Sequence, residues 1–197
     1  REYLDAIVGG TVAWNQLINP SFYSTSTIQG VTFTKSNNNE IIATGENTST
    51  TTNSTFEFAN ITNNVANHVY YITGCPKNGA SGAYRTWLNI IKPGGNVSGY
   101  ETGNGTIIKF DSDATAFSAW AVVYRGYAIT GSLVWKPLIF DLTAMFCPTI
   151  ADYVYSLEQA TAGAGVAWFR KLFPKDYYAY DAGTLKSVEG LESHKTV

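Results

Sequence analysis

The chain has 197 residues and a formal charge of −2, from thirteen basic and fifteen acidic side chains. This balance excludes the basic footprint of a nucleic-acid-binding protein, and no apolar run approaches the roughly 20 residues that span a bilayer. Charged residues are scarce and hydrophobic residues are common, which excludes disorder and indicates one packed domain with a small appendage. Because the only methionine is Met145, we expect a processed product or a piece of a longer protein.

From about residue 31 to residue 141 the sequence predicts short strands separated by polar turns. Apolar and polar residues alternate in 31–35 and 54–58, and β-branched and aromatic residues fill 68–73, 84–91, 106–110, 117–124 and 133–140. Turn-forming residues such as 36–39 and 93–96 separate these runs, and 47–55 is expected to be a solvated loop. Seven to nine strands at this spacing predict a mainly β protein, a jelly-roll β-sandwich. Pro137 is expected at a strand edge or a bulge, since it lacks an N–H donor.

The last quarter of the chain predicts a short helical appendage. Thr149 is expected to cap a helix over 150–160, and a second helix carries Val166, Phe169, Leu172 and Phe173 before Pro174 ends it. We therefore divide the chain into a lead-in segment (1–20), a β-sandwich domain (21–146) and a helical and extended C-terminal tailpiece (147–197).

Few residues suit catalysis or metal binding. The only histidines are His68 and His194, which leaves little room for a zinc site or a His-based catalytic device. The only cysteines, Cys75 and Cys147, lie far apart in sequence, and two free thiols are favoured over a disulfide. A glycosidase needs a carboxylate pair, but turn or surface roles explain the acids more simply; those considered are Glu57, Glu101, Asp111 and Asp113. We therefore predict no enzyme and no cofactor.

A structural calcium ion is the one cofactor that the sequence leaves open. Asp111 and Asp113 stand two apart in a predicted turn, where hard oxygen ligands suit that ion. An Asx-turn between two strands is the simpler interpretation.

The clearest functional pattern is aromatic. On an alternating strand, Arg85, Trp87 and Asn89 share one face, and on a later strand Trp120 and Tyr124 share a face. If both faces are open to solvent, they form aromatic platforms with polar partners. Such surfaces suit carbohydrates, because rings stack on the C–H faces of sugars while amide and guanidinium groups bind the hydroxyls. The alternative, and the commoner arrangement in sandwiches, is that both tryptophans belong to the core.

Three parts of the chain resemble a known kind of module. They are IVGGTVAWNQL (7–17), KPLIFDLTAMF (136–146), and the tailpiece from 149–157 through FPKDYYAY (173–180). They resemble tail-associated structural proteins of phages and prophages from Gram-positive, gut-type bacteria. In that family a jelly-roll, carbohydrate-binding-module-like sandwich ends in a KPxxFDLTxMF strand, and a helical FRxLFPKDYYxY tailpiece follows it. Relatives have glycine after the Met-Phe pair, where this chain has Cys147 and Pro148.

The resemblance implies a virion structural protein, a tail fibre or baseplate segment, that is assembled in the host cytoplasm. Its partners would be a cell-surface glycan and other virion tail proteins, and its likeness to fibre proteins implies a homotrimer. Trp14, Trp168 and 177–180 are where contacts with neighbouring subunits are expected; packing of the tailpiece on the sandwich is the alternative. Two other functions stay open: an extracellular carbohydrate-binding module of a secreted bacterial glycosidase or adhesin, and a structural spacer without a ligand.

Overall fold

In the computed structural model, residues 25–36, 40–62, 65–77, 85–95 and 97–173 are described. This part of the chain holds eleven strands followed by three helices. The strands are β1 (Ser26–Ile28), β2 (Val31–Lys35), β3 (Ile41–Gly45), β4 (Ser54–Ile61), β5 (Val69–Thr73), β6 (Thr86–Ile91), β7 (Val97–Glu101), β8 (Thr106–Lys109), β9 (Phe117–Val123), β10 (Leu133–Trp135) and β11 (Leu138–Asp141). The helices are α2 (Leu142–Met145), α3 (Pro148–Ala160) and α4 (Ala164–Leu172).

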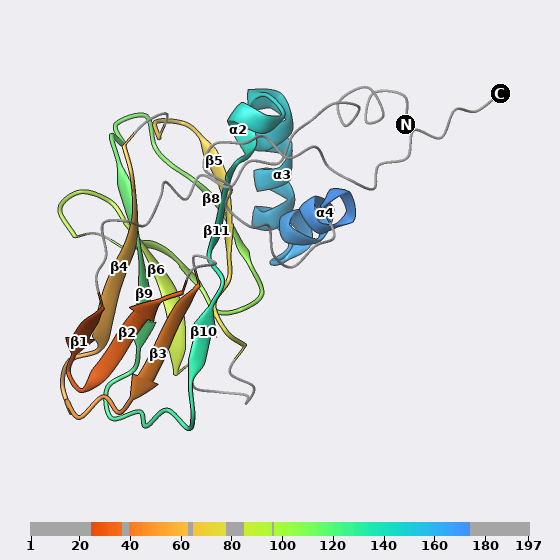
Figure 1. Ribbon diagram of the computed structural model, residues 1–197. Coiled ribbons are helices and arrows are strands. Elements are labelled where there is room, and N and C mark those ends of the chain that lie inside the picture. The colour runs from red at the N-terminus through yellow and green to blue at the C-terminus, as the bar shows by residue number, and fades with distance from the viewer. Residues whose placement is uncertain (1–24, 37–39, 63–64, 78–84, 96, 174–197) are drawn as a thin grey trace.

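The strands form three antiparallel sheets, with the orders β1-β2-β3-β10, β11-β5-β8 and β4-β9-β6-β7 (Figure 1). One hydrophobic core lies between the third sheet and the other two. Phe33 of β2 stacks on Phe56 of β4 with 5.2 Å between the ring centroids. Tyr70 of β5 meets Phe117 of β9 edge-on at 5.0 Å. The third sheet therefore has one face on this core and a second face that points away from it.

The helices cover the other face of the β11-β5-β8 sheet (Figure 1). Tyr71 of β5 stacks on Phe169 of α4 with 4.4 Å between the ring centroids, and Phe140 of β11 lies 5.4 Å from the same ring. Because both faces of this sheet are covered, every residue of β5 and of β11 is buried. The half-buried Trp168 packs edge-on against Phe146 within the same chain. The described part of the tailpiece thus packs on the sheets; Trp14 and 177–180 lie outside the described residues.

Pro137 interrupts what looks like one strand in the sequence. The predicted strand 133–140 is two strands in different sheets, and the N–H of Lys136 donates to the carbonyl oxygen of Gly74 at 2.8 Å between them. Gly74 has φ 117°, and a Cβ atom there would lie 2.0 Å from the Lys136 oxygen. Only glycine allows the chain to cross at this point.

The prediction of a mainly β protein with C-terminal helices is confirmed, with three differences. The elements β1, β3, β7 and α2 were not predicted, because they are short or rich in polar and glycine residues. Thr149 is not the cap of α3, because the helix begins at Pro148 and Cys147 stands at the N-cap without a side-chain hydrogen bond. The segment 47–55 is not wholly solvated, since Asn47 is buried and donates to the carbonyl oxygen of Val123 at 3.3 Å. The lead-in segment and residues 174–197 lie outside the described part.

Among the helices that the structure describes, none has the length and apolar character needed to cross a membrane.

Candidate carbohydrate-binding face

The predicted aromatic residues lie on the outer face of the β4-β9-β6-β7 sheet. On β6, Leu88 and Ile90 are fully buried in the core, whereas Trp87 and Asn89 alternate with them and are half-buried. On β9, Ala119 and Ala121 face the core, whereas Trp120 is half-buried on the opposite side. The two tryptophans therefore face away from the core. We call this surface the aromatic face and define it by Arg85, Trp87, Asn89, Trp120 and Tyr124 together with Glu57, Tyr100 and Arg125.

The strand register sets these side chains side by side. Trp120 of β9 stands opposite Asn89 of β6 on one side and Glu57 of β4 on the other. Trp87 stands opposite Val122, which has no exposed surface although it belongs to neither core cluster. The large side chains of the outer face thus cover the sheet itself and form a continuous surface.

Polar groups are held next to the rings. The indole Nε1 of Trp87 donates to Oδ1 of Asn89 at 2.6 Å, which leaves the Asn89 amide hydrogens for another acceptor. Ser118 donates from its hydroxyl to Oε1 of Glu57 at 2.7 Å. The Nε1 atom of Trp120 is shielded from solvent and has no acceptor among the described residues. The face therefore combines flat apolar rings with fixed hydrogen-bonding groups.

Tyr124 closes one end of the aromatic face. Its ring lies 6.2 Å from that of Trp87, measured between centroids. The guanidinium carbons of Arg85 and Arg125 lie 5.8 Å and 5.4 Å from the Tyr124 centroid. The backbone N–H of Tyr124 donates to the carbonyl oxygen of Arg85 at 2.8 Å, which fixes this end to the start of β6.

All five residues predicted from the sequence lie on this one face, and the structure adds three that the sequence analysis missed. Tyr100 on the edge strand β7 stands opposite Asn89 and is 59% exposed. Glu57 and Arg125 were also missed as part of this face. Alternation within β4 was the available signal for Glu57, but nothing in the sequence pairs β4 with β9. For Tyr100 the strand itself was hidden between glycine-rich turns.

The candidate carboxylates have structural partners. Asp111 pairs with the ammonium group of Lys92, and its carbonyl oxygen accepts from the N–H of Ala114 at 3.2 Å in a turn. Glu101 is fully buried and accepts from the backbone N–H groups of Cys75 at 2.8 Å, of Gly105 at 2.8 Å and of Gly103. Burial raises the pKa of the Glu101 carboxyl, while these donors act in the opposite direction.

The candidate calcium ligands were Asp111 and Asp113, and Asp113 is exposed. The described part of the chain holds no cluster of three or more His, Cys, Asp or Glu side chains that could bind a metal ion. The turn interpretation accounts for the contacts of Asp111.

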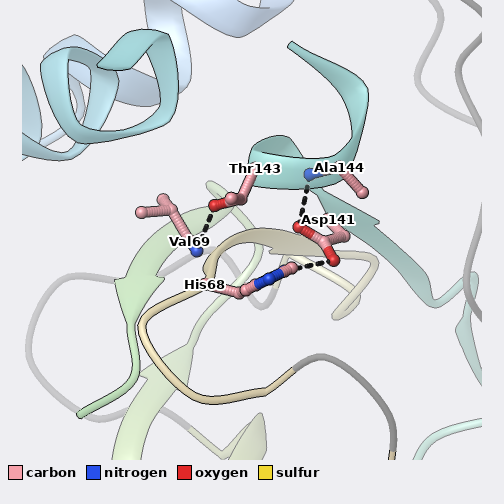
Figure 2. Close-up of polar contacts among 5 residues, drawn as sticks. All are labelled: His68, Val69, Asp141, Thr143 and Ala144. Atoms are coloured by element: carbon pink, nitrogen blue, oxygen red, sulfur yellow. Dashed lines mark hydrogen bonds and ion pairs between the residues drawn. The ribbon is translucent and has the colours of Figure 1, made fainter. Parts of the chain in front are cut away.

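His68 and Asp141 form a further pair of titratable side chains (Figure 2). Nδ1 of His68 lies 2.7 Å from Oδ2 of the buried Asp141, and Oδ1 of Asp141 accepts from the N–H of Ala144 at 3.0 Å. The hydroxyl of Thr143 accepts from the N–H of Val69 at 3.0 Å. Asp141 thus caps α2 and binds the loop before β5, so we interpret this cluster as the anchor of the helices on the sheet.

Cys75 and Cys147 are both free thiols. Burial and the neighbouring Glu101 raise the pKa of the Cys75 thiol to about 12, so this thiol stays protonated and unreactive in the folded protein.

Comparisons with known proteins assign no family. No family model matches the chain, and no curated protein matches it. A chain in the crystal structure of accessory secretory protein 1, 2 and 3 in Streptococcus pneumoniae shares a distant likeness. The two chains are 10% identical, the match covers 67% of this chain and 95% of that chain, and the TM-score is 0.38. A likeness at this level supports no statement about family or function.

Proposed function

We propose that this protein is a non-enzymatic phage tail or fibre module that displays a glycan-binding surface for attachment to the host. The single observation that carries the glycan-binding part is the aromatic face. Trp87, Trp120 and Tyr124 lie on one side of a sheet, away from the core, next to the polar groups of Asn89 and Arg85.

The physical argument concerns the match between this face and a sugar. Saccharide rings have apolar C–H faces that stack on aromatic rings, while their hydroxyls need fixed hydrogen-bonding partners. A solvent-open sheet face binds weakly, since it buries only one side of a ligand. Repetition on a particle overcomes this weakness, because linked sites gain from effective concentration.

The phage part of the proposal is supported by the resemblance of 7–17, 136–146 and the tailpiece to tail-associated proteins. On the same resemblance we propose a jelly-roll topology, a homotrimer and a place in the virion tail. The same aromatic face would serve a carbohydrate-binding module of a secreted glycosidase or adhesin. Tail genes beside the coding sequence favour the phage module, whereas an upstream signal peptide and catalytic domain favour the secreted one.

A glycan array tests the binding function. The purified chain is presented multivalently on an array that includes cell-wall polysaccharides of Gram-positive bacteria. We expect reproducible hits that weaken at least tenfold in the variants Trp87→Ala and Trp120→Ala, which is a loss of about 1.4 kcal/mol or more in binding. The control is Tyr153→Ala, which removes a half-exposed aromatic ring on α3, a helix that packs on the β11-β5-β8 sheet.

The stability of the variants separates a binding role from a core role. Trp87 and Trp120 are half-buried, so each alanine variant should lose less than about 2 kcal/mol of unfolding free energy. Trp135→Ala serves as the comparison, because Trp135 is fully buried and its loss should cost about 3–5 kcal/mol. A blank array with well-folded protein would refute glycan binding and favour a structural spacer.

A further inference from the structure

We propose that the Tyr124 end of the aromatic face binds an anionic group of the saccharide, a carboxylate or a phosphodiester, through Arg85 and Arg125. This inference rests on the glycan-binding function proposed above and names the chemical class of the ligand.

Hydrogen bonds fix the backbone at both arginines, and both side chains approach the Tyr124 ring. Both guanidinium carbons lie within 5.8 Å of the Tyr124 ring centroid. The carbonyl oxygen of Arg85 accepts from the N–H of Tyr124 at 2.8 Å, and the N–H of Arg125 donates to Oδ1 of Asn53 at 3.1 Å. These contacts fix the backbone from which both arginine side chains project.

The charges of the two arginines are not neutralised within the described part of the chain. There, Lys92, Lys109 and Lys136 each pair with a carboxylate, whereas no carboxylate pairs with Arg85 or Arg125. Both arginines are exposed, and both approach the same ring. An anion bound beside the Tyr124 ring would lie near two positive charges that no carboxylate of the described residues neutralises. The two arginines thus form a local positive patch on a chain whose formal net charge is −2.

The hydrogen-bonding groups of this end match an anion. A guanidinium group has five N–H donors in a planar fork that fits carboxylate and phosphate oxygens. Arg125 directs one of them at the carbonyl oxygen of Thr51, 3.4 Å away, which leaves the others for a ligand. The Trp87 and Tyr124 centroids lie 6.2 Å apart, and both guanidinium groups approach the Tyr124 ring. We therefore expect a sugar stacked on Trp87 to direct a substituent towards these groups. Neutral hydroxyls would require no such concentration of charge.

Matched pairs of polysaccharides test this inference. Each acidic polysaccharide is compared with its carboxyl-reduced form, and each phosphodiester polymer with its dephosphorylated form. The two arms distinguish a uronic acid from a phosphate as the source of the charge. We expect at least tenfold weaker binding to the neutral member of one pair. Binding to the acidic member should also weaken steeply between about 0.01 M and about 1 M salt, as the Debye length falls from about 30 Å to about 3 Å.

The variants Arg85→Gln and Arg125→Gln locate the effect. Each should weaken binding to the acidic member about five- to tenfold and binding to the neutral member less than about twofold. Lys171→Gln is the matched control, because it removes one exposed positive charge on α4. Equal binding of both members in every pair, unchanged in the arginine variants, would overturn the inference while glycan binding stands. No binding to any polysaccharide, or binding that Trp87→Ala leaves unchanged, would overturn the proposed function and this inference with it.

Discussion

Replacing Glu101 by alanine should be among the most destabilising single changes in this fold. The carboxylate is the shared acceptor of three backbone N–H groups, and it joins the β7–β8 turn to the segment after β5. The contacts with Cys75 and Gly103 are fully buried, whereas the contact with Gly105 is partly open to water. Each buried donor left without an acceptor costs about 1–3 kcal/mol. Two such donors give an expected loss of about 2–6 kcal/mol in unfolding free energy.

Glu101→Gln separates hydrogen bonding from side-chain volume. One amide oxygen can still accept from Gly103 and Gly105, but the amide nitrogen then faces the N–H of Cys75 and one donor is lost. We expect this variant to lose about 1–3 kcal/mol, less than the alanine variant. Urea unfolding followed by tryptophan fluorescence measures both values.

The control for both variants is Glu46→Ala, because Glu46 is exposed and its removal should change the unfolding free energy by less than about 0.5 kcal/mol. A loss below about 1 kcal/mol in Glu101→Ala would refute the reasoning, since it would mean that water replaces the carboxylate at both buried donors.

Three further predictions concern titratable groups. Burial raises the folded-state pKa of the Glu101 carboxyl above its ordinary 4.5, so its protonated form stabilises the fold at low pH. That contribution to the unfolding free energy is lost as the pH rises through the raised pKa. The unfolding free energies of wild type and Glu101→Gln should therefore converge with rising pH. Asp141→Ala should lose about 2–4 kcal/mol, measured by urea unfolding, because it removes the α2 cap and the buried partner of His68. A thiol reagent should label the half-buried Cys147 in native protein and Cys75 only after unfolding, as mass spectrometry would detect.

Each of these has a contradicting result. A difference between wild type and Glu101→Gln that grows with pH would mean that the three amide donors outweigh burial. An Asp141→Asn variant as unstable as Asp141→Ala would show that the hydrogen bond to Ala144, which asparagine can keep, contributes nothing. Labelling of Cys75 at the rate of Cys147 would mean that the segment after β5 opens in the native state.

Alternation along single strands was readable from the sequence because side chains on a strand point to opposite faces in turn. It grouped Trp87 with Asn89 and separated both from Leu88, and the structure has the same grouping. The helical spacing of apolar residues such as Val166 and Phe169, which are buried against the sheet, indicated the second of the two main C-terminal helices.

Which face is open, and which acids are buried, required the tertiary structure. Both faces of β6 carry polar and apolar residues, and only the packing of the other two sheets against the third sheet closed the side of Leu88 and left Trp87 outside. Glu101 looks like a surface acid beside a turn, yet the chain at Cys75 comes from 26 positions away to bury it. The longer strands and the two sides of each were thus readable from the sequence, because these features depend on neighbours along the chain. Only the tertiary structure decided the aromatic face and the buried carboxylate, because these depend on contacts between distant segments.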